Sequence, residues 1–171
     1  APKEEVALTL TIACEREECP AVTFSYDEAC AYANRALQDS MAQDCEVTTS
    51  NWQFNNWLQR SRADLHMMVT DTPQGSYPYA GVPWFSTPFG RDGIITAMEY
   101  LWVNPSIAKG VLQYLAARQA SDVDAARDAE PGKILHESRL GEMAAMGEIP
   151  FGRYYGSVDS TPLFMMLAGA Y

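Results

Sequence analysis

Two adjacent charged residues, Arg91 and Asp92, follow an aromatic loop over residues 84–90 that is broken by Pro83 and Pro88. An arginine donates hydrogen bonds to sugar hydroxyls and a carboxylate accepts them. Flat aromatic faces cover the apolar C–H surface of a pyranose ring. Loops with such side chains are suited to holding a ligand and poorly suited to building a core. The stretch therefore predicts a site for a polar, sugar-like ligand.

A second stretch, residues 153–162, repeats this composition, because aromatic residues and a glycine again precede an aspartate, Asp159. We expect both stretches to line one sugar-binding crater. The aromatic side chains that could form its walls are Tyr77, Tyr79, Trp84, Phe85 and Phe89. Two structural alternatives remain open for the charged pair. Asp92 could cap a helix that begins there, or Arg91 and Asp92 could be an ion pair at that helix start.

Both stretches resemble a known family. Residues 77–97, Tyr-Pro-Tyr-Ala-Gly-Val-Pro-Trp-Phe-Ser-Thr-Pro-Phe-Gly-Arg-Asp-Gly-Ile-Ile-Thr-Ala, resemble the signature of bacterial glycogen-debranching-type proteins, the amylo-α-1,6-glucosidase group. Residues 154–164 resemble the second signature of that group, where Ala commonly stands in place of Ser160. Residues 129–137 also fit. The resemblance covers roughly residues 45–171 well and residues 1–44 more weakly.

The resemblance implies a mainly α fold, with part of an (α/α)6 six-hairpin barrel like those of glucoamylases and trehalases. It implies that residues 1–22 are the end of an N-terminal β-sandwich domain and that residues 23–48 are a linker helix. Residues 49–171 would then be the first hairpins of the barrel, which would continue beyond the chain.

The resemblance further implies inverting hydrolysis of an α-1,6- or α-1,4-glucosidic bond in a glycogen-like α-glucan, by one carboxyl group as acid and another as base. Arg91 and Asp92 would hold the sugar hydroxyls, Asp159 would line the same pocket, and His136 and Glu137 would lie near its mouth. The full set of substrate-binding residues that it implies is Trp84, Phe85, Arg91, Asp92, His136, Glu137, Tyr155 and Asp159.

The family's acid and base lie in stretches downstream of the second signature that this chain does not contain. Asp159 is a fallback candidate for the acid. We therefore expect the chain to hold a substrate without hydrolysing it. Two alternatives stay open: a non-catalytic glycan-binding module, and a glycosidase for a trehalose-like or other glucoside, since a fold does not by itself define a substrate.

Helices dominate the expected secondary structure. Capping boxes, in which Ser precedes Glu or Gln by three positions, predict helices over residues 25–43 and 50–70. The apolar spacing in the second helix predicts that Trp52 and Trp57 pack in a core.

The later part of the chain predicts three further helices. One begins at Asp92, one begins at the Asn104–Pro105 cap and runs to about Gln119, and one begins at Asp159 or Ser160. Alternating apolar residues over 6–13 predict a strand, which needs a partner from the sheet of another domain. The final helix stays apolar to the last residue, so we expect exposed helices to pair between copies.

Composition excludes several classes of partner. A net charge of −10 disfavours nucleic acid and anionic membranes, because phosphates would be repelled. No apolar run approaches the roughly 18 residues that a membrane span needs.

The four cysteines, at positions 14, 19, 30 and 45, have no metal-binding spacing, and the acidic loop over residues 121–132 does not match a calcium-binding pattern. We expect no metal and no organic cofactor, and free thiols in a reducing bacterial cytoplasm.

Overall fold

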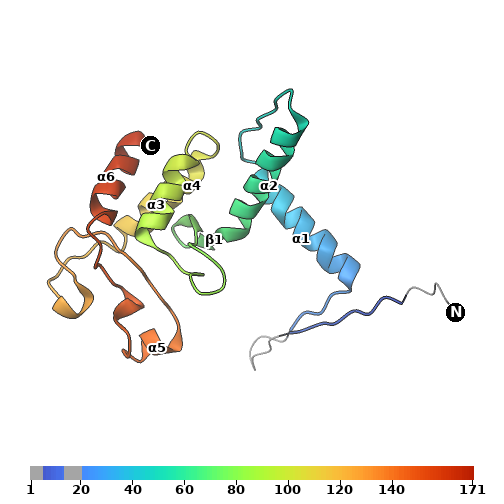
Figure 1. The fold of residues 1–171 in the computed structure, drawn as a ribbon. Coiled ribbons are helices and arrows are strands. Elements are labelled where there is room, and N and C mark those ends of the chain that lie inside the picture. The colour runs from blue at the N-terminus through green and yellow to red at the C-terminus, as the bar shows by residue number, and fades with distance from the viewer. Residues whose placement is uncertain (1–5, 14–20) are drawn as a thin grey trace. The chain divides into compact units, whose positions relative to one another are not determined.

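The computed structural model describes residues 6–13 and 21–171, which belong to two compact units, Ala1–Ala42 and Gln43–Tyr171. The first unit contains helix α1 (Tyr26–Met41). The second contains α2 (Trp52–Met68), strands β1 (Val69–Thr72) and β2 (Gly75–Pro78), α3 (Gly90–Glu99), α4 (Pro105–Ala116), the short helix α5 (Glu142–Ala145) and α6 (Ser160–Ala170), as Figure 1 shows. Two 3₁₀ turns, at Ala125–Arg127 and Pro150–Gly152, lie between α4 and α6.

Helix α1 confirms the first capping box. The Ser25 hydroxyl accepts a hydrogen bond from the Glu28 amide, and the Glu28 carboxylate accepts one from the Ser25 amide.

The predicted strand over residues 6–13 is absent: the structure assigns these residues no strand, and all of their side chains are exposed. A strand exists only when its backbone groups pair with a neighbour.

Helix α2 differs from its prediction in two ways. Its N-terminal cap is Asn51 and not Ser50, because the Asn51 side chain accepts hydrogen bonds from the backbone amides of Gln53 and Phe54. The prediction that Trp52 and Trp57 pack in the core is wrong, since their side chains are 69% and 60% exposed. Helical spacing defines a face of the helix but does not show what covers that face.

The hairpin formed by β1 and β2 was not anticipated from the sequence. Four residue pairs make its antiparallel ladder, from Val69 opposite Pro78 to Thr72 opposite Gly75. The Thr72 hydroxyl closes the turn by donating to the Gly75 carbonyl at 2.7 Å. Strands of four residues are too short to show a clear alternating pattern, which explains why the sequence reads as an irregular loop.

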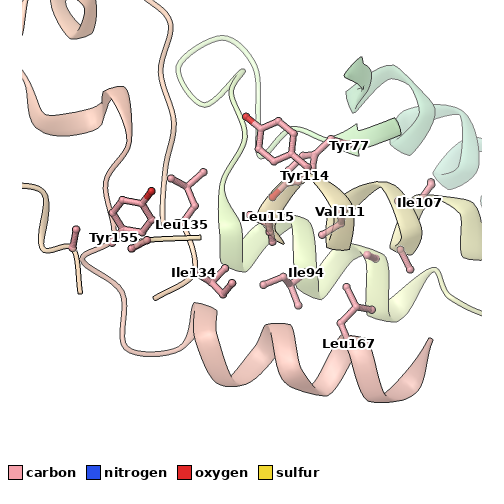
Figure 2. Close-up of a cluster of buried hydrophobic side chains, with 14 residues drawn as sticks. Tyr77, Ile94, Ile107, Val111, Tyr114, Leu115, Ile134, Leu135, Tyr155 and Leu167 are labelled. Atoms are coloured by element: carbon pink, nitrogen blue, oxygen red, sulfur yellow. The ribbon is translucent and has the colours of Figure 1, made fainter. Parts of the chain in front are cut away.

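The core lies where α3, α4, α6 and β2 meet (Figure 2). Helix α3 packs against both α4 and α6, and α4 packs on β2. The Asn104–Pro105 start of α4 is confirmed, because the Asn104 side chain accepts from the Ser106 amide at 3.0 Å. The fully buried side chains include Tyr77, Ile94, Ile107, Val111, Leu115, Ile134, Leu135 and Leu167.

The fold is therefore mainly helical with one small sheet, as the sequence predicts at the level of fold class. The six-hairpin barrel remains a prediction. Among the described residues, none of the helices combines the length and the apolar character that crossing a membrane requires.

Candidate functional site

Three segments that are distant in the sequence form one backbone ladder next to the start of α3. The Gly90 amide donates to the His136 carbonyl at 2.8 Å, and the His136 amide donates to the Tyr154 carbonyl at the same distance. The Ser138 amide donates to the Pro88 carbonyl at 3.1 Å. The structure thus brings together the parts of the chain that carry all three family-like motifs.

Gly90 allows this approach. A Cβ atom built on Gly90 would lie 1.9 Å from the Leu135 carbonyl oxygen, a distance that no side chain tolerates. The hairpin holds the neighbouring residue, because the buried Tyr77 hydroxyl donates to the Phe89 carbonyl at 2.7 Å. The start of α3 is therefore held by the hairpin and by the 134–139 segment together.

Arg91 and Asp159 form an ion pair across the start of two helices. Arg91 is the second residue of α3, and Asp159 precedes α6. The Arg91 Nη1 atom lies 3.3 Å from the Asp159 Oδ2 atom, and the side chains are 50% and 37% exposed. Both groups therefore remain open to a ligand while orienting each other.

Asp159 is held as an anion. The hydrogen bond from the Ser157 hydroxyl is the largest of the causes that lower the pKa of Asp159; burial opposes it, and the Arg91 guanidinium adds to the lowering. Asp159 does not cap α6 with its own side chain, because the Ser157 hydroxyl accepts from the Ser160 amide instead. A lowered pKa suits a carboxylate that accepts hydroxyl groups better than one that donates a proton.

Asp92 lies in the first turn of α3, half-buried, but it is not the cap. The cap position is Phe89, which has no side-chain cap hydrogen bond. Within the described chain, no hydrogen bond or ion pair is found for the Asp92 carboxylate. It does lie near the buried Tyr77 hydroxyl, whose pKa is raised chiefly by burial and also by the Asp92 charge. The negative charge is favourable at this helix start.

The predicted aromatic wall residues divide into an exposed group and a buried group, and the prediction is wrong for Tyr77 and Phe89, which are only 0% and 9% exposed. Trp84 and Phe85 are 77% and 54% exposed, so their faces are available to a ligand. Tyr155 is 3% exposed and belongs to the core, where its hydroxyl donates to the Arg118 carbonyl at 2.8 Å. Its ring therefore has no open face for a sugar in this structure.

His136 and Glu137 lie inside the ladder. Glu137 is 5% exposed and pairs with Arg139, whose Nη1 atom also donates to the Trp84 carbonyl at 3.1 Å. The His136 ring packs edge-on against two aromatic rings, Phe89 and Tyr154. Its Nδ1 atom is buried without a hydrogen-bond partner. Glu137 is therefore a buried support of the loops, whereas His136 is only half-buried.

The structure contains a neighbouring pocket that the sequence did not predict. A cavity of about 420 Å³ lies beside residues 86–88 and includes Tyr79, Tyr114 and Arg118 in its lining. The Arg118 guanidinium stacks 3.6 Å from the centre of the Tyr114 ring. Tyr114 lies on α4 and Arg118 in the turn that follows it, and their spacing of four residues is the sequence signal that could have indicated this pair. Neither Arg91 nor Asp92 lines this cavity.

Comparison with protein-family models found no match for this chain, and comparison with curated proteins found none. The carbohydrate-related interpretation therefore depends on the motif residues and on the geometry described above.

Proposed function

We propose that this chain is the sugar-holding part of an α-glucan glycosidase of the glycogen-debranching type. The observation that carries the proposal is the Arg91–Asp159 pair, which joins the two motifs. The first motif also carries the exposed aromatic residues Trp84 and Phe85. Ionised Asp159 accepts sugar hydroxyls and Arg91 donates to them, while the aromatic faces cover the ring.

In this proposal the chain binds the sugar and does not hydrolyse it. A general acid must be protonated when it acts, and the lowered pKa of Asp159 opposes that role. The full glycosidase would cleave α-1,6- or α-1,4-glucosidic bonds by inversion, with the acid and base supplied from outside this chain.

Calorimetric titration with maltose, isomaltose and trehalose tests the proposal. Arg91→Gln is expected to weaken binding of the preferred sugar by about tenfold, the size of a lost hydrogen bond to a charged group. The matched control is Arg60→Gln, which removes the same charge from an exposed ion pair on α2. Flat titrations with all three sugars, or equal losses in both variants, would contradict the proposal.

The lowered pKa of Asp159 also favours a second candidate, a glycan-binding module with no hydrolytic role. An assay of the full-length protein on a branched α-glucan separates the two candidates. Release of glucose is expected for the glycosidase and not for the binding module. A preference for trehalose over both glucobioses would instead favour a trehalose-like substrate.

A further inference from the structure

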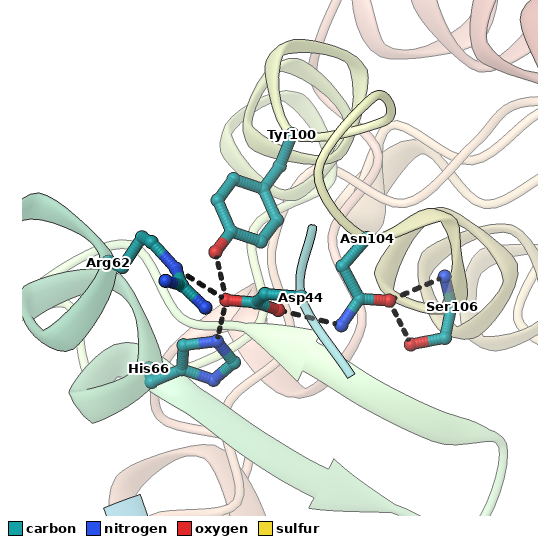
Figure 3. Close-up of polar contacts among 6 residues, drawn as sticks. All are labelled: Asp44, Arg62, His66, Tyr100, Asn104 and Ser106. Atoms are coloured by element: carbon teal, nitrogen blue, oxygen red, sulfur yellow. Dashed lines mark hydrogen bonds and ion pairs between the residues drawn. The ribbon is translucent and has the colours of Figure 1, made fainter. Parts of the chain in front are cut away.

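A second candidate site surrounds Asp44, at the other end of α3. Figure 3 shows this carboxylate at the centre of a polar cluster formed with α2 and with the turn between α3 and α4. The Asp44 side chain is fully buried. Its Oδ2 atom accepts from the Tyr100 hydroxyl at 2.5 Å and from the Arg62 Nε atom at 3.2 Å. Its Oδ1 atom accepts from the Asn104 side-chain amide at 3.0 Å.

His66 completes the cluster, with its Nε2 atom 2.8 Å from Asp44 Oδ2. Because an ionised carboxylate only accepts hydrogen bonds, this nitrogen must carry the proton. Burial alone would raise the pKa of Asp44, but the hydrogen bonds from Tyr100, His66 and Asn104 outweigh it and lower the pKa. The charge of Asp44 therefore stays paired with that of Arg62.

The segment that follows Asp44, residues 45–49, is held in place at both of its ends. The Cys45 amide donates to the Val103 carbonyl at 2.8 Å. At the other end, the Thr49 amide donates to the Asn55 side chain, and the Asn55 side-chain amide donates back to the Thr49 carbonyl, both at 2.9 Å. A loop fixed in this way loses little entropy when a ligand binds beside it.

This segment, α2 and the end of α3 enclose a cavity of about 310 Å³. That volume lies at the lower end of the range for small-molecule sites. The wall is mainly apolar, and its apolar side chains are those of Val47, Leu58, Leu65, Trp102 and Val103.

The charges that line the cavity favour a cation. Arg62 is neutralised by Asp44, whereas Glu46 and Glu99 have no ion pair within the described residues. Both Glu residues are exposed, and Trp102, which lines the same cavity, is 66% exposed. An aromatic ring next to uncompensated carboxylates attracts an organic cation by charge and by cation–π interaction.

We propose that this cavity binds a small organic ammonium ion, with its apolar body against the leucine and valine side chains and its charge between Glu46 and Glu99. The cavity shares no lining residue with the Arg91–Asp159 pair, so the proposal is independent of the sugar site.

Three probes of similar size test the charge preference: phenyltrimethylammonium, benzyl alcohol and benzoate. Methyl resonances of Leu58, Leu65, Val47 and Val103 in two-dimensional NMR spectra report binding in the cavity. We expect saturable shifts with phenyltrimethylammonium, weaker ones with benzyl alcohol and none with benzoate.

The double variant Glu46→Gln with Glu99→Gln is expected to weaken binding of the cation about fivefold, in line with charge contacts at an exposed site. Binding of benzyl alcohol should not change. The matched control, Glu142→Gln with Glu148→Gln, removes the same charge from α5 and the loop after it.

The proposal is overturned if phenyltrimethylammonium produces no saturable shifts, or if benzyl alcohol or benzoate binds as tightly. It is also overturned if the control variant loses as much affinity, because the attraction would then come from the overall charge. Methyl spectra of the unliganded variants verify that each one keeps the fold.

Discussion

Arg91 and Asp159 are 68 positions apart in the sequence, yet their side chains meet at 3.3 Å. As a contribution to folding, this half-exposed pair is worth only a few tenths of a kcal/mol, because water screens it. In the proposal, the pair matters because it orients the two side chains toward a ligand. Each partner fixes the other's position at the start of a helix, and neither is buried away from a ligand.

Asp44 has the opposite character, since its charge is buried and fully paired. Asp44→Asn should lower the free energy of unfolding by about 3 kcal/mol at neutral pH, because Arg62 would lose its buried counter-charge. The control is Asp64→Asn, whose carboxylate is 47% exposed and pairs with Arg60 on the surface. It should change stability by less than about 0.5 kcal/mol. Urea denaturation measures both.

The stability lost in Asp44→Asn should also depend on pH. The pKa of Asp44 is lower in the folded state than in the unfolded chain, so its stabilisation is fully present above the unfolded pKa of about 4. It is lost as the pH falls through the folded pKa. The stability difference between the wild type and Asp44→Asn should therefore narrow in urea titrations below pH 4. A difference that stays constant down to pH 2 would contradict the lowered pKa.

At the scale of elements, the hairpin and α4 depend on a close backbone contact. A Cβ atom built on Gly110 of α4 would lie 2.2 Å from the Ser76 carbonyl oxygen in β2. The hairpin in turn positions the start of α3 through the Tyr77 hydroxyl. The approach of α4 to β2 thus contributes to the geometry of the candidate sugar site.

Gly110→Ala should destabilise the protein by about 1–3 kcal/mol, because the new methyl group must push the hairpin away from α4. Gly169→Ala is the matched control, since Gly169 is also helical and its Cβ would meet nothing within 4 Å. That variant should be neutral or stabilising by about 0.5 kcal/mol, because alanine favours the helix. Thermal unfolding followed by circular dichroism compares the two; equal effects would contradict the close contact.

At the scale of the whole molecule, the buried apolar core belongs to the second unit, because its residues lie between Tyr77 and Leu167. Helix α1, in the first unit, has no buried residue. Residues 43–171 expressed alone should therefore unfold in a single cooperative transition, with the near-ultraviolet dichroism of packed tyrosines. A gradual transition without such a signal would show that the core needs the first unit.

Large apolar side chains remain exposed on α2 and α6, among them Trp52, Trp57 and Met165. The pairing of copies through exposed helices remains a prediction, and the exposed apolar side chains of α2 and α6 are the surface that it would bury.

The sequence by itself determined the features that depend on local interactions. The helix starts at Ser25 and Asn104 are of this kind, because a cap needs only the next few amides. The aromatic and charged composition of residues 84–92 likewise indicated a candidate site before any geometry was known.

The tertiary structure alone decided which of these residues are available. It placed Tyr155 in the core and left Trp57 exposed, and it joined Arg91 to Asp159 rather than to its neighbour Asp92. It also revealed the Asp44 cluster, whose partners come from α2 and from the turn after α3. Burial and long-range pairing depend on how elements pack, and no local pattern of residues encodes that packing.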